Sequence, residues 1–409
     1  MTDSGDTPAA TAVEPRYVAT FAELTATVQA LAQGPWIALD TEFVRDQSYY
    51  PVLCLIQVAN PQGVACIDPF ALDDLSPLVA LLANPEVTKI VHAAGQDLEV
   101  LYHNLRVLPQ GLFDTQIAAA LLGYGDAVGY APLVEATLGV TLDKSQTRTD
   151  WQQRPLNSAQ LCYAVADVYY LGALYQLLQR ALVAQGRAGW AAEEVAALLR
   201  RERFVVCPQQ AWRRVRGLHR LKGPGLAALR GLAAWREAEA MAQDRPRRWI
   251  VGDDTLVELA WRRPENRSQL KGLRRLNPGV VGRYGAALLA VLEAARQCSP
   301  EDWPQNPTPQ PLTPRQGAAV EAALDTVRQR AQALGISPER LARRRELERW
   351  VTGDRADDIP LFTGWRRAVA GEAVLAQLTA GLASSGDGDT TGIDNCSDFI
   401  NVEGKGRCP

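Results

Sequence analysis

Hydrophobic and polar positions alternate along the first part of the chain with two different periods. Apolar residues at Phe21, Leu24, Val28 and Leu31 recur at helical spacing, which predicts a helix over residues 17–33. Three short apolar runs follow with turn residues between them, so the pattern predicts consecutive strands, the last two joined as a hairpin. These runs cover residues 36–39, 53–58 and 63–67.

Helices and one further strand follow the hairpin. A helix is predicted after Asp114, with Asp114 or Thr115 as its N-cap. Residues 158–185 predict one long helix capped by Ser158. Strands interleaved with helices indicate an α/β domain over residues 17–199. Its other predicted elements are a helix near 75–82, a strand over 88–93 and a helix over 97–105.

The strand signal disappears after about residue 200. Residues 200–297 alternate helical stretches with Gly/Pro breaks, as in "LKGPG" and "NPGVVGRYG", and predict a small all-helical domain. Residues 298–313 are Pro-rich and predict an extended linker. Residues 314–382 predict a second all-helical domain of similar length, which suggests a diverged copy of the first.

The two ends of the chain differ from the rest in composition. Residues 1–16 are polar and acidic, residues 383–409 are rich in Gly and Asp, and both segments are predicted to be disordered. Asp387, Asp389 and Asp398 fall at positions of a calcium-binding loop. However, Asp398 replaces the closing Glu and no helical pattern follows, so we do not expect a calcium site.

Composition narrows the class of protein. The chain contains no run of 18 or more apolar residues, and its N-terminus lacks the layout of a signal peptide, so we expect a cytoplasmic protein without a membrane span. The seven cysteines form no CxxC pair, which indicates reduced thiols rather than disulfides. The three histidines do not cluster with cysteines at ligand spacing, so no zinc site is expected.

Charge is distributed unevenly although the net charge is only −3. Residues 1–199 carry 9 Lys+Arg against 21 Asp+Glu, a net charge of −12. Residues 200–283 carry 20 against 8, a net charge of +12. Solvated surfaces of opposite sign would explain this division. The sharper interpretation is that the basic segment binds a polyanion and the acidic half contains a site that requires carboxylates.

Two carboxylates stand at the end of the first predicted strand, in "PWIALDTEFVRD". Residues i and i+2 of a strand point to the same face, so Asp40 and Glu42 lie side by side. Their like charges repel each other unless a cation lies between them, and Mg²⁺ or Mn²⁺ prefers such oxygen ligands. The same pair also occurs at strand ends without function, so a site requires further acids.

Further acids occur at similar boundaries. Asp97 starts a helix directly after the strand 88–93, where an ordinary N-terminal helix acid is the alternative interpretation. Asp167 lies in an apolar helical stretch, where burial without a compensating partner would be costly. Tyr163 lies on the same helical face as Asp167, and its phenol could orient a water molecule. A tyrosine of the domain core is the alternative.

Asp114 is a weaker candidate because helix capping explains it. His92 and His103 are more simply structural histidines. Four acids and a tyrosine on separate elements suit two-metal phosphoryl chemistry, in which two ions clamp the attacking and leaving oxygens.

These residues resemble a known family. "LDTEF" (39–43), "HAAGQDLEVL" (92–101) and "YAVAD" (163–167) are similar to the three motifs of the DEDD 3′-to-5′ exonucleases, and the Tyr-x-x-x-Asp spacing marks the tyrosine-bearing branch. Residues 138–171, "LGVTLDKSQTRTDWQQRPLNSAQLCYAVADVYYL", resemble ribonuclease D more specifically. Residues 208–292 are similar to the HRDC nucleic-acid-binding domain. A second, weaker likeness of this kind covers 314–382.

The resemblance implies a fold: an α/β ribonuclease H-like exonuclease domain followed by two small all-α HRDC-type domains. It also implies two divalent ions, Mg²⁺ or Mn²⁺, and no small-molecule cofactor. The implied metal ligands are Asp40, Glu42, Asp97 and Asp167, and Tyr163 would position the attacking water.

The resemblance further implies a 3′-to-5′ exoribonuclease that releases nucleoside 5′-monophosphates and trims the 3′ ends of transfer RNA precursors and other small structured RNAs. Lys144 and Arg154 are then candidate contacts to RNA phosphates, although surface charge explains them equally well. Two alternatives remain: a DNA 3′-to-5′ exonuclease, since no sequence feature reads the 2′-hydroxyl, and a non-catalytic RNA-binding adaptor.

Overall fold

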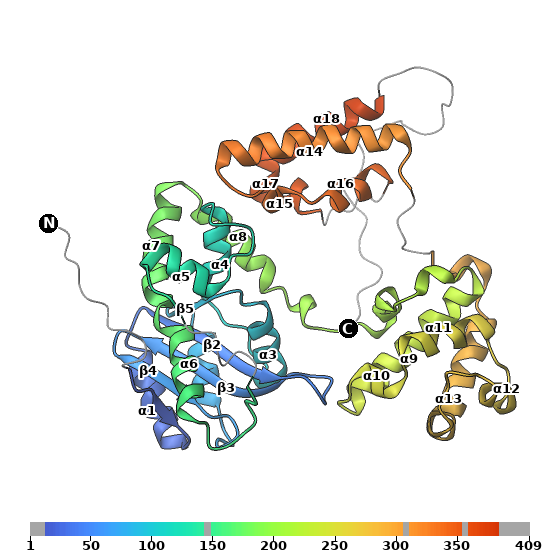
Figure 1. Cartoon of the computed structure of the whole chain (residues 1–409), viewed down its shortest axis with the longest axis horizontal. Helices are drawn as coiled ribbons and strands as arrows, with labels where there is room; N and C mark the ends of the chain where they lie inside the picture. The colour runs from blue at the N-terminus through green and yellow to red at the C-terminus, as the bar shows by residue number, and fades with distance from the viewer. Residues whose placement is uncertain (1–12, 143–148, 306–310, 354–358, 384–409) are drawn as a thin grey trace.

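The computed structural model describes residues 13–142, 149–305, 311–353 and 359–383. An α/β domain is followed by two separate helical units (Figure 1). The predicted fold class is therefore confirmed in its main feature, an α/β domain with helical units after it.

A six-stranded mixed sheet forms the centre of the α/β domain, in the order β1-β4-β3-β2-β5-β6. Neighbours β2, β3 and β4 pair antiparallel, whereas β1–β4, β2–β5 and β5–β6 pair parallel. The turn residues at 60–63 join β3 to β4 as the predicted hairpin. The strands are β1 (Arg16–Val18), β2 (Trp36–Val44), β3 (Val52–Asn60), β4 (Gly63–Ile67), β5 (Thr88–Val91) and β6 (Leu112–Asp114).

Helices cover both faces of this sheet. Along β2, Ile37 and Leu39 pack with α1 (Phe21–Leu31), α2 (Ser76–Ala83) and α3 (Gly95–Leu105). Ala38 belongs to the opposite core. This alternation follows from the two-residue period of a strand. The helices on that side, or beside it, are α4 (Thr115–Leu121), α5 (Tyr130–Leu138), α6 (Ser158–Tyr169), α7 (Leu171–Ala184) and α8 (Ala188–Leu198).

Several predicted boundaries were wrong. The first helix starts only at Phe21 because Thr20 forms a capping box with Glu23, and β1 precedes it. The predicted long helix is interrupted at Tyr170 into α6 and α7. Asn157, not Ser158, caps α6, since its side chain accepts a hydrogen bond from the Gln160 backbone.

The first helical unit has its own hydrophobic core, formed by residues such as Leu229, Leu256 and Leu288. Pro224 and Pro278 stand in the first turns of its two long helices, where a proline is well tolerated. Its α-helices are α9 (Pro224–Ala242), α10 (Arg247–Ile250), α11 (Asp253–Arg262), α12 (Arg267–Lys271) and α13 (Pro278–Arg296). Short 3₁₀ helices precede them at Arg201–Arg203, Pro208–Arg214 and Leu218–Arg220.

The predicted linker is not simply extended where the structure describes it. Pro300–Asp302 forms a 3₁₀ turn, and the indole of Trp303 lies against Gly223 at the start of α9. Residues 306–310 lie outside the described residues, as do 1–12 and 384–409 of the terminal segments predicted to be disordered. The prediction for 1–16 was wrong at its end, since Arg16 already pairs in β1.

The second helical unit docks on α8 of the α/β domain (Figure 1). Trp190 and Trp365 stack with ring centroids 4.5 Å apart. The backbone N–H of Trp365 donates to Glu193 Oε2 at 2.9 Å, and its indole N–H donates to Glu194 Oε1 at 2.9 Å. The helices of the unit are α14 (Pro314–Leu334), α15 (Pro338–Leu341), α16 (Arg344–Val351), 3₁₀ Pro360–Phe362, α17 (Gly364–Arg366), π-helical Arg367–Gly371 and α18 (Glu372–Ala383).

Among the described residues, the helical segment Ser158–Ala184 is long and apolar enough to cross a membrane by length and composition. It corresponds to α6 and α7, which pack against the sheet of the α/β domain. We therefore interpret it as a core segment of this domain.

Candidate active site

The strand β2 presents two carboxylates on one face of the sheet. Asp40 pairs in register with Gln57 of β3 and Glu42 with Leu55, and the register shifts directly after Glu42. A bulge at this point bends the strand and ends its regular pairing. Since the side chains of Asp40 and Glu42 share the face of Ala38, they lie on the side of the sheet that α6 and α7 cover.

The helix α6 brings the third carboxylate to this face. It packs across β2, β3 and β4, with Ala164 buried beside Leu55 of β3. Asp167 lies one helical turn after Ala164, and carboxylate oxygens of Asp40, Glu42 and Asp167 lie within 4.8 Å of one another. Tyr163 hydrogen-bonds to the Asp167 side chain. Sequence spacing had predicted that this tyrosine and this acid share one helical face.

Asp97 reaches the same region from the edge of β5. That strand ends at Val91, and a turn through Ala93, with φ of 58°, leads into α3 at Gly95. The side chain of Thr41, which alternates to the other face of β2, donates a hydrogen bond to Asp97 Oδ1 at 2.5 Å. Asp97 is 8% exposed. It does not belong to the group within 4.8 Å, but its charge raises the pKa of Asp40.

Burial raises the pKa of all four carboxyl groups, and repulsion within the group adds to this for Asp40, Glu42 and Asp167. Desolvation is the main cause for Asp40, followed by the charges of Asp97, Asp167 and Glu42. Desolvation and the same neighbours raise the pKa of Glu42 to about 9. The pKa of Asp167 rises to about 7 and that of Asp97 to about 6, again mainly through desolvation. Four acids that resist ionisation together indicate that the fold assembles them for a cation.

The donor set fits hard divalent cations. Only carboxylate oxygens converge here, and Mg²⁺ and Mn²⁺ prefer oxygen ligands. Gln57, the cross-strand neighbour of Asp40, is fully buried, and neither atom of its amide has a hydrogen-bond partner among the described residues. An orphaned amide beside crowded carboxylates is consistent with a site completed by a cation and its water ligands.

Asp114 and His92 have structural roles, whereas the buried Nδ1 of His103 has no hydrogen-bond partner among the described residues. Asp114 caps α4 by accepting hydrogen bonds from the backbone N–H of Gln116 and Ile117, and it also binds those of Ala93 and Ala94 at 3.2 and 2.9 Å. It therefore holds the turn that positions Asp97. The ring nitrogens of His92 contact Thr115 Oγ1 and the Val128 carbonyl at 2.9 and 3.1 Å, as expected of a structural histidine.

The predicted phosphate contact at Arg154 lacks structural support. Its guanidinium donates to both oxygens of Asp68 at 2.7 Å and to the Cys54 carbonyl at 2.6 Å. These bonds tie the segment before α6 to the sheet and occupy the group that would bind a phosphate. Lys144 lies outside the described residues.

Sequence reasoning missed two residues near the carboxylates. Thr41 lies between two candidate ligands, and its position on the opposite face concealed its bond to Asp97. The hydroxyl of Tyr130 donates to the Ala166 carbonyl at 3.0 Å and accepts from the Tyr170 backbone N–H at 3.3 Å, directly behind Asp167. The spacing within α6 and α7 carried no signal for this contact from α5.

Two parts of the chain match known protein families. The 3′-5′ exonuclease family matches residues 15–183, and the HRDC domain family matches residues 225–292. Ribonuclease D of Zymomonas mobilis is 38% identical over 89% of this chain and 94% of its own length. Ribonuclease D of Acidiphilium cryptum is 38% identical over 88% of this chain and 92% of its own length.

The crystal structure of Escherichia coli RNase D, described as an exoribonuclease involved in structured RNA processing, shares the fold with a TM-score of 0.82. It is 35% identical and covers 90% of this chain and 99% of its own length. With the carboxylate cluster on the sheet and this agreement over nearly the whole length, the chain belongs to the ribonuclease D family of metal-dependent 3′-to-5′ exoribonucleases.

Proposed function

We propose that the chain hydrolyses RNA from the 3′ end with two divalent ions, Mg²⁺ or Mn²⁺, and releases nucleoside 5′-monophosphates. The observation that carries this proposal is the convergence of carboxylate oxygens from Asp40, Glu42 and Asp167 within 4.8 Å, with the charge of Asp97 acting on the same group. Strands and helices far apart in the sequence contribute these side chains.

Asp40, Glu42, Asp97 and Asp167 would hold the ions. When bound, a pair of ions supplies an activated water for attack on phosphorus and charge to stabilise the leaving 3′ oxygen. Thr41 fixes one carboxylate oxygen of Asp97 by a hydrogen bond and so restricts the orientation of this ligand. The four acids are therefore preorganised on three elements of one rigid domain.

Tyr163 would position the attacking water. Its hydroxyl is hydrogen-bonded to Asp167, so the phenol oxygen is held beside a carboxylate of the site. In that place the phenol oxygen can accept a hydrogen bond from the attacking water and so orient the lone pair of the water toward phosphorus.

The first helical unit would hold RNA through phosphates, since residues 200–283 carry 20 Lys+Arg against 8 Asp+Glu. We propose transfer RNA precursors and other small structured RNAs as substrates and the cytoplasm as the location. Support comes from the basic unit beside an acidic active site and from membership in the ribonuclease D family.

The test is incubation of the purified chain with a 3′-extended transfer RNA and Mg²⁺ or Mn²⁺, with products resolved at one-nucleotide steps. Stepwise shortening with release of nucleoside 5′-monophosphates is expected. Asp40→Asn is the matched control and should leave the RNA intact. A matched DNA oligonucleotide degraded equally fast would instead favour a DNA exonuclease. No degradation of any 3′-tailed RNA with Mn²⁺ would indicate a binding protein without activity.

A further inference from the structure

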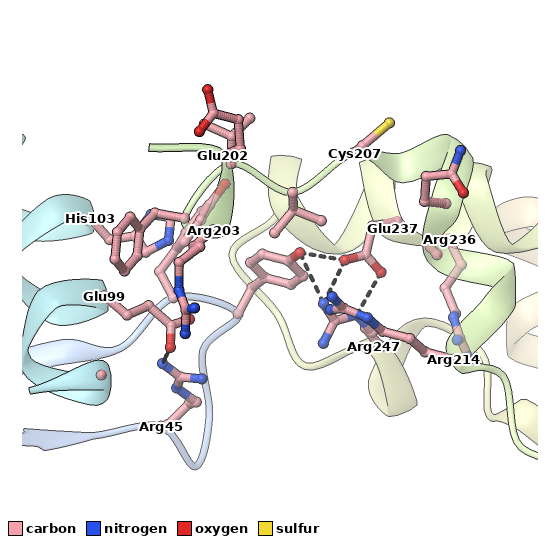
Figure 2. A pocket seen from close by; sticks show the side chains of 18 of the residues that line it. Arg45, Glu99, His103, Glu202, Arg203, Cys207, Arg214, Arg236, Glu237 and Arg247 are labelled. Carbon is pink, nitrogen blue, oxygen red and sulfur yellow. Dashed lines mark hydrogen bonds and ion pairs between the residues drawn. The ribbon is translucent and has the colours of Figure 1, made fainter. Parts of the chain in front are cut away.

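We propose that the pocket between the α/β domain and the first helical unit is a phosphate-binding subsite for the RNA strand upstream of the scissile bond (Figure 2). This inference rests on the proposed function and specifies where the acidic nuclease domain gains affinity for RNA. The pocket has a volume of about 850 Å³, large enough for more than one nucleotide.

The pocket and the carboxylate site share the helix α3. One wall of the pocket is formed by the β2–β3 loop and by Gly95, Glu99 and His103 of α3. These three residues recur at every fourth position on one face of the helix, whereas Asp97 lies on another face. The opposite wall is formed by residues 198–214 and by α9 and α10. A strand whose 3′ end reaches Asp97 would therefore cross α3 to reach this opening.

Charge in the pocket favours an anion. Six arginines and four acidic residues line it, a difference of two positive charges. Three arginines are neutralised in pairs: Arg45–Glu99 at 2.8 Å, Arg236–Asp253 at 2.7 Å and Arg247–Glu237 at 2.5 Å. The other three, Arg203, Arg214 and Arg248, are exposed and make no ion pair with any residue that the structure describes. Their guanidinium groups are available for phosphate oxygens.

Aromatic rings also line the pocket. The rings of Tyr50 and His103 line the pocket with centroids 4.7 Å apart, and Tyr102 adjoins His103 at 5.4 Å. Bases of single-stranded RNA stack on such rings without regard to sequence. The combination of free guanidinium groups with aromatic rings fits a nucleic acid strand better than an acidic peptide, which offers no bases to stack.

A group of contacts between the two walls, here called the latch, fixes the geometry of the pocket. The Tyr49 hydroxyl donates a hydrogen bond to Glu237, and the Arg247 guanidinium lies 4.8 Å from the Tyr49 ring centroid. Figure 2 shows the ion pair between Glu237 and Arg247. Asp244 Oδ1 accepts the backbone N–H groups of Tyr49 and Tyr50, both at 3.0 Å. Because the loop that bears Tyr49 continues from β2, the latch joins the strand of Asp40 and Glu42 to the first helical unit.

The subsite also resolves an electrostatic difficulty. Residues 1–199 carry a net charge of −12, so the α/β domain repels a polyphosphate. The three unpaired arginines on the opposite wall outnumber Glu202, the acid of the lining that has no ion pair among the described residues, and so offset this repulsion within the pocket. Arginines in ion pairs could not offset the repulsion, since a neighbouring carboxylate already compensates their charges.

The test measures cleavage of a short and of a long RNA by a triple variant, Arg203→Gln, Arg214→Gln and Arg248→Gln. A matched control changes Arg180, Arg330 and Arg345 to Gln, since these are exposed, lie outside the basic segment 200–283 and do not line the pocket. For each protein we would measure kcat/KM on a dinucleotide and on an oligoadenylate of about 12 nucleotides, long enough to reach any site of ordinary size. Thermal unfolding checks that each variant folds.

The pocket variant should lose at least about tenfold more kcat/KM on the long RNA than on the dinucleotide, because only the long RNA reaches the three arginines that the variant removes. The control should keep the wild-type ratio between the two substrates. In an Asp40→Asn background, affinity for the same oligoadenylate should depend less on salt, with a slope smaller by about 2 for three lost phosphate contacts.

Equal losses on both substrates, or an equal change of the ratio in the control, would overturn the subsite. Unchanged RNA affinity together with lost binding of poly-glutamate would assign the pocket to an acidic protein partner. If the unaltered chain cleaves neither substrate, the proposed function fails, whereas a wild-type enzyme with an unaffected pocket variant refutes only the subsite.

Discussion

Asp40 is surrounded by the charges of Asp97, Asp167 and Glu42, and its pKa is raised by burial and by these neighbours. Replacing it with Asn removes one charge from the crowded group. We expect Asp40→Asn to raise the melting temperature of the metal-free protein and to abolish its stabilisation by Mn²⁺. Cleavage should be roughly a hundred- to thousandfold slower, because several kcal/mol of the transition-state stabilisation that the metal ions supply would be lost. Differential scanning calorimetry and single-turnover rates would measure both, and unchanged turnover would refute the metal assignment.

Tyr163 allows the positioning of water to be separated from metal binding. The Tyr163→Phe substitution keeps the ring beside Trp151 but removes the hydroxyl bonded to Asp167. We expect cleavage to slow by roughly a hundredfold, because the group that orients the attacking water is lost. Mn²⁺ affinity, measured by titration followed with electron paramagnetic resonance, should change little. A parallel loss of Mn²⁺ affinity would mean that the tyrosine acts only through Asp167.

The raised pKa values predict how metal stabilisation depends on pH. The pKa of Glu42 is about 9 against an ordinary 4.5, so over this range the folded state holds a proton that the unfolded chain has lost. The stability of the metal-free protein therefore falls as pH rises through this window, and Asp167, with a pKa of about 7, contributes in the same direction. The increase in melting temperature caused by Mn²⁺ should be larger at about pH 8.5 than at about pH 6. An increase that is equal at both values would contradict the crowding of these acids.

Individual residues differ in how far the sequence predicts them. The shared face of Asp40 and Glu42 follows from strand alternation alone, and the shared face of Tyr163 and Asp167 from helical spacing. Arg154 could not be assigned in this way, because its partner Asp68 lies 86 positions earlier in the chain. Thr41 was missed because a side chain on the opposite face gains its partner only through the turn at Ala93.

At the scale of elements, the turn between β5 and α3 determines where Asp97 lies. Asp114 supports this turn and caps α4, so Asp114→Ala should cost about 1–2 kcal/mol of stability and slow cleavage by displacing Asp97. Asp114→Asn can still accept hydrogen bonds and should recover most of both losses. Chemical denaturation and cleavage rates would measure the pair. An Asn variant as impaired as the Ala variant would show that the negative charge, and not the cap, matters.

Long elements were predicted more accurately than short ones. The periodic run of β2 and the capped start of α4 were located, but β1 and β6 have 3 residues each and show no periodic pattern. The break between α6 and α7 leaves no Gly or Pro in the sequence. In the fold it coincides with the bond between the Tyr170 N–H and the Tyr130 hydroxyl, which no local pattern contains.

At the scale of the whole molecule, the second helical unit is attached to α8 through Glu194. This carboxylate accepts from Arg366 and the Trp365 indole and lies 3.5 Å from Arg340, all largely buried. Glu194→Gln leaves the Arg366 guanidinium without its counter-charge, whereas Arg340 keeps Asp126 at 2.9 Å, and should weaken docking by about 3 kcal/mol. Hydrogen exchange in α8 and α17 should accelerate. Glu321→Gln, at an exposed pair with Arg344, is the control and should cost no more than about 1 kcal/mol. Equal exchange in the two variants would contradict this role.

Sequence alone predicted the division of charge and the succession of an α/β domain and two helical units. It could not predict that the units return to the α/β domain at two places, through Tyr49 and through Trp365. Such contacts join residues 188 and 172 positions apart and leave no mark on local patterns.

The docking of the second helical unit on α8 means that the covalent tether at 298–313 is not its sole attachment. The second helical unit is connected to the first by the peptide chain. It is connected to the α/β domain by a stacked pair of indoles and by buried ion pairs. A single proteolytic cut in that tether would open the polypeptide without releasing a fragment. New chain ends introduced there by circular permutation should likewise leave the assembly, and the opening through which RNA enters, in place.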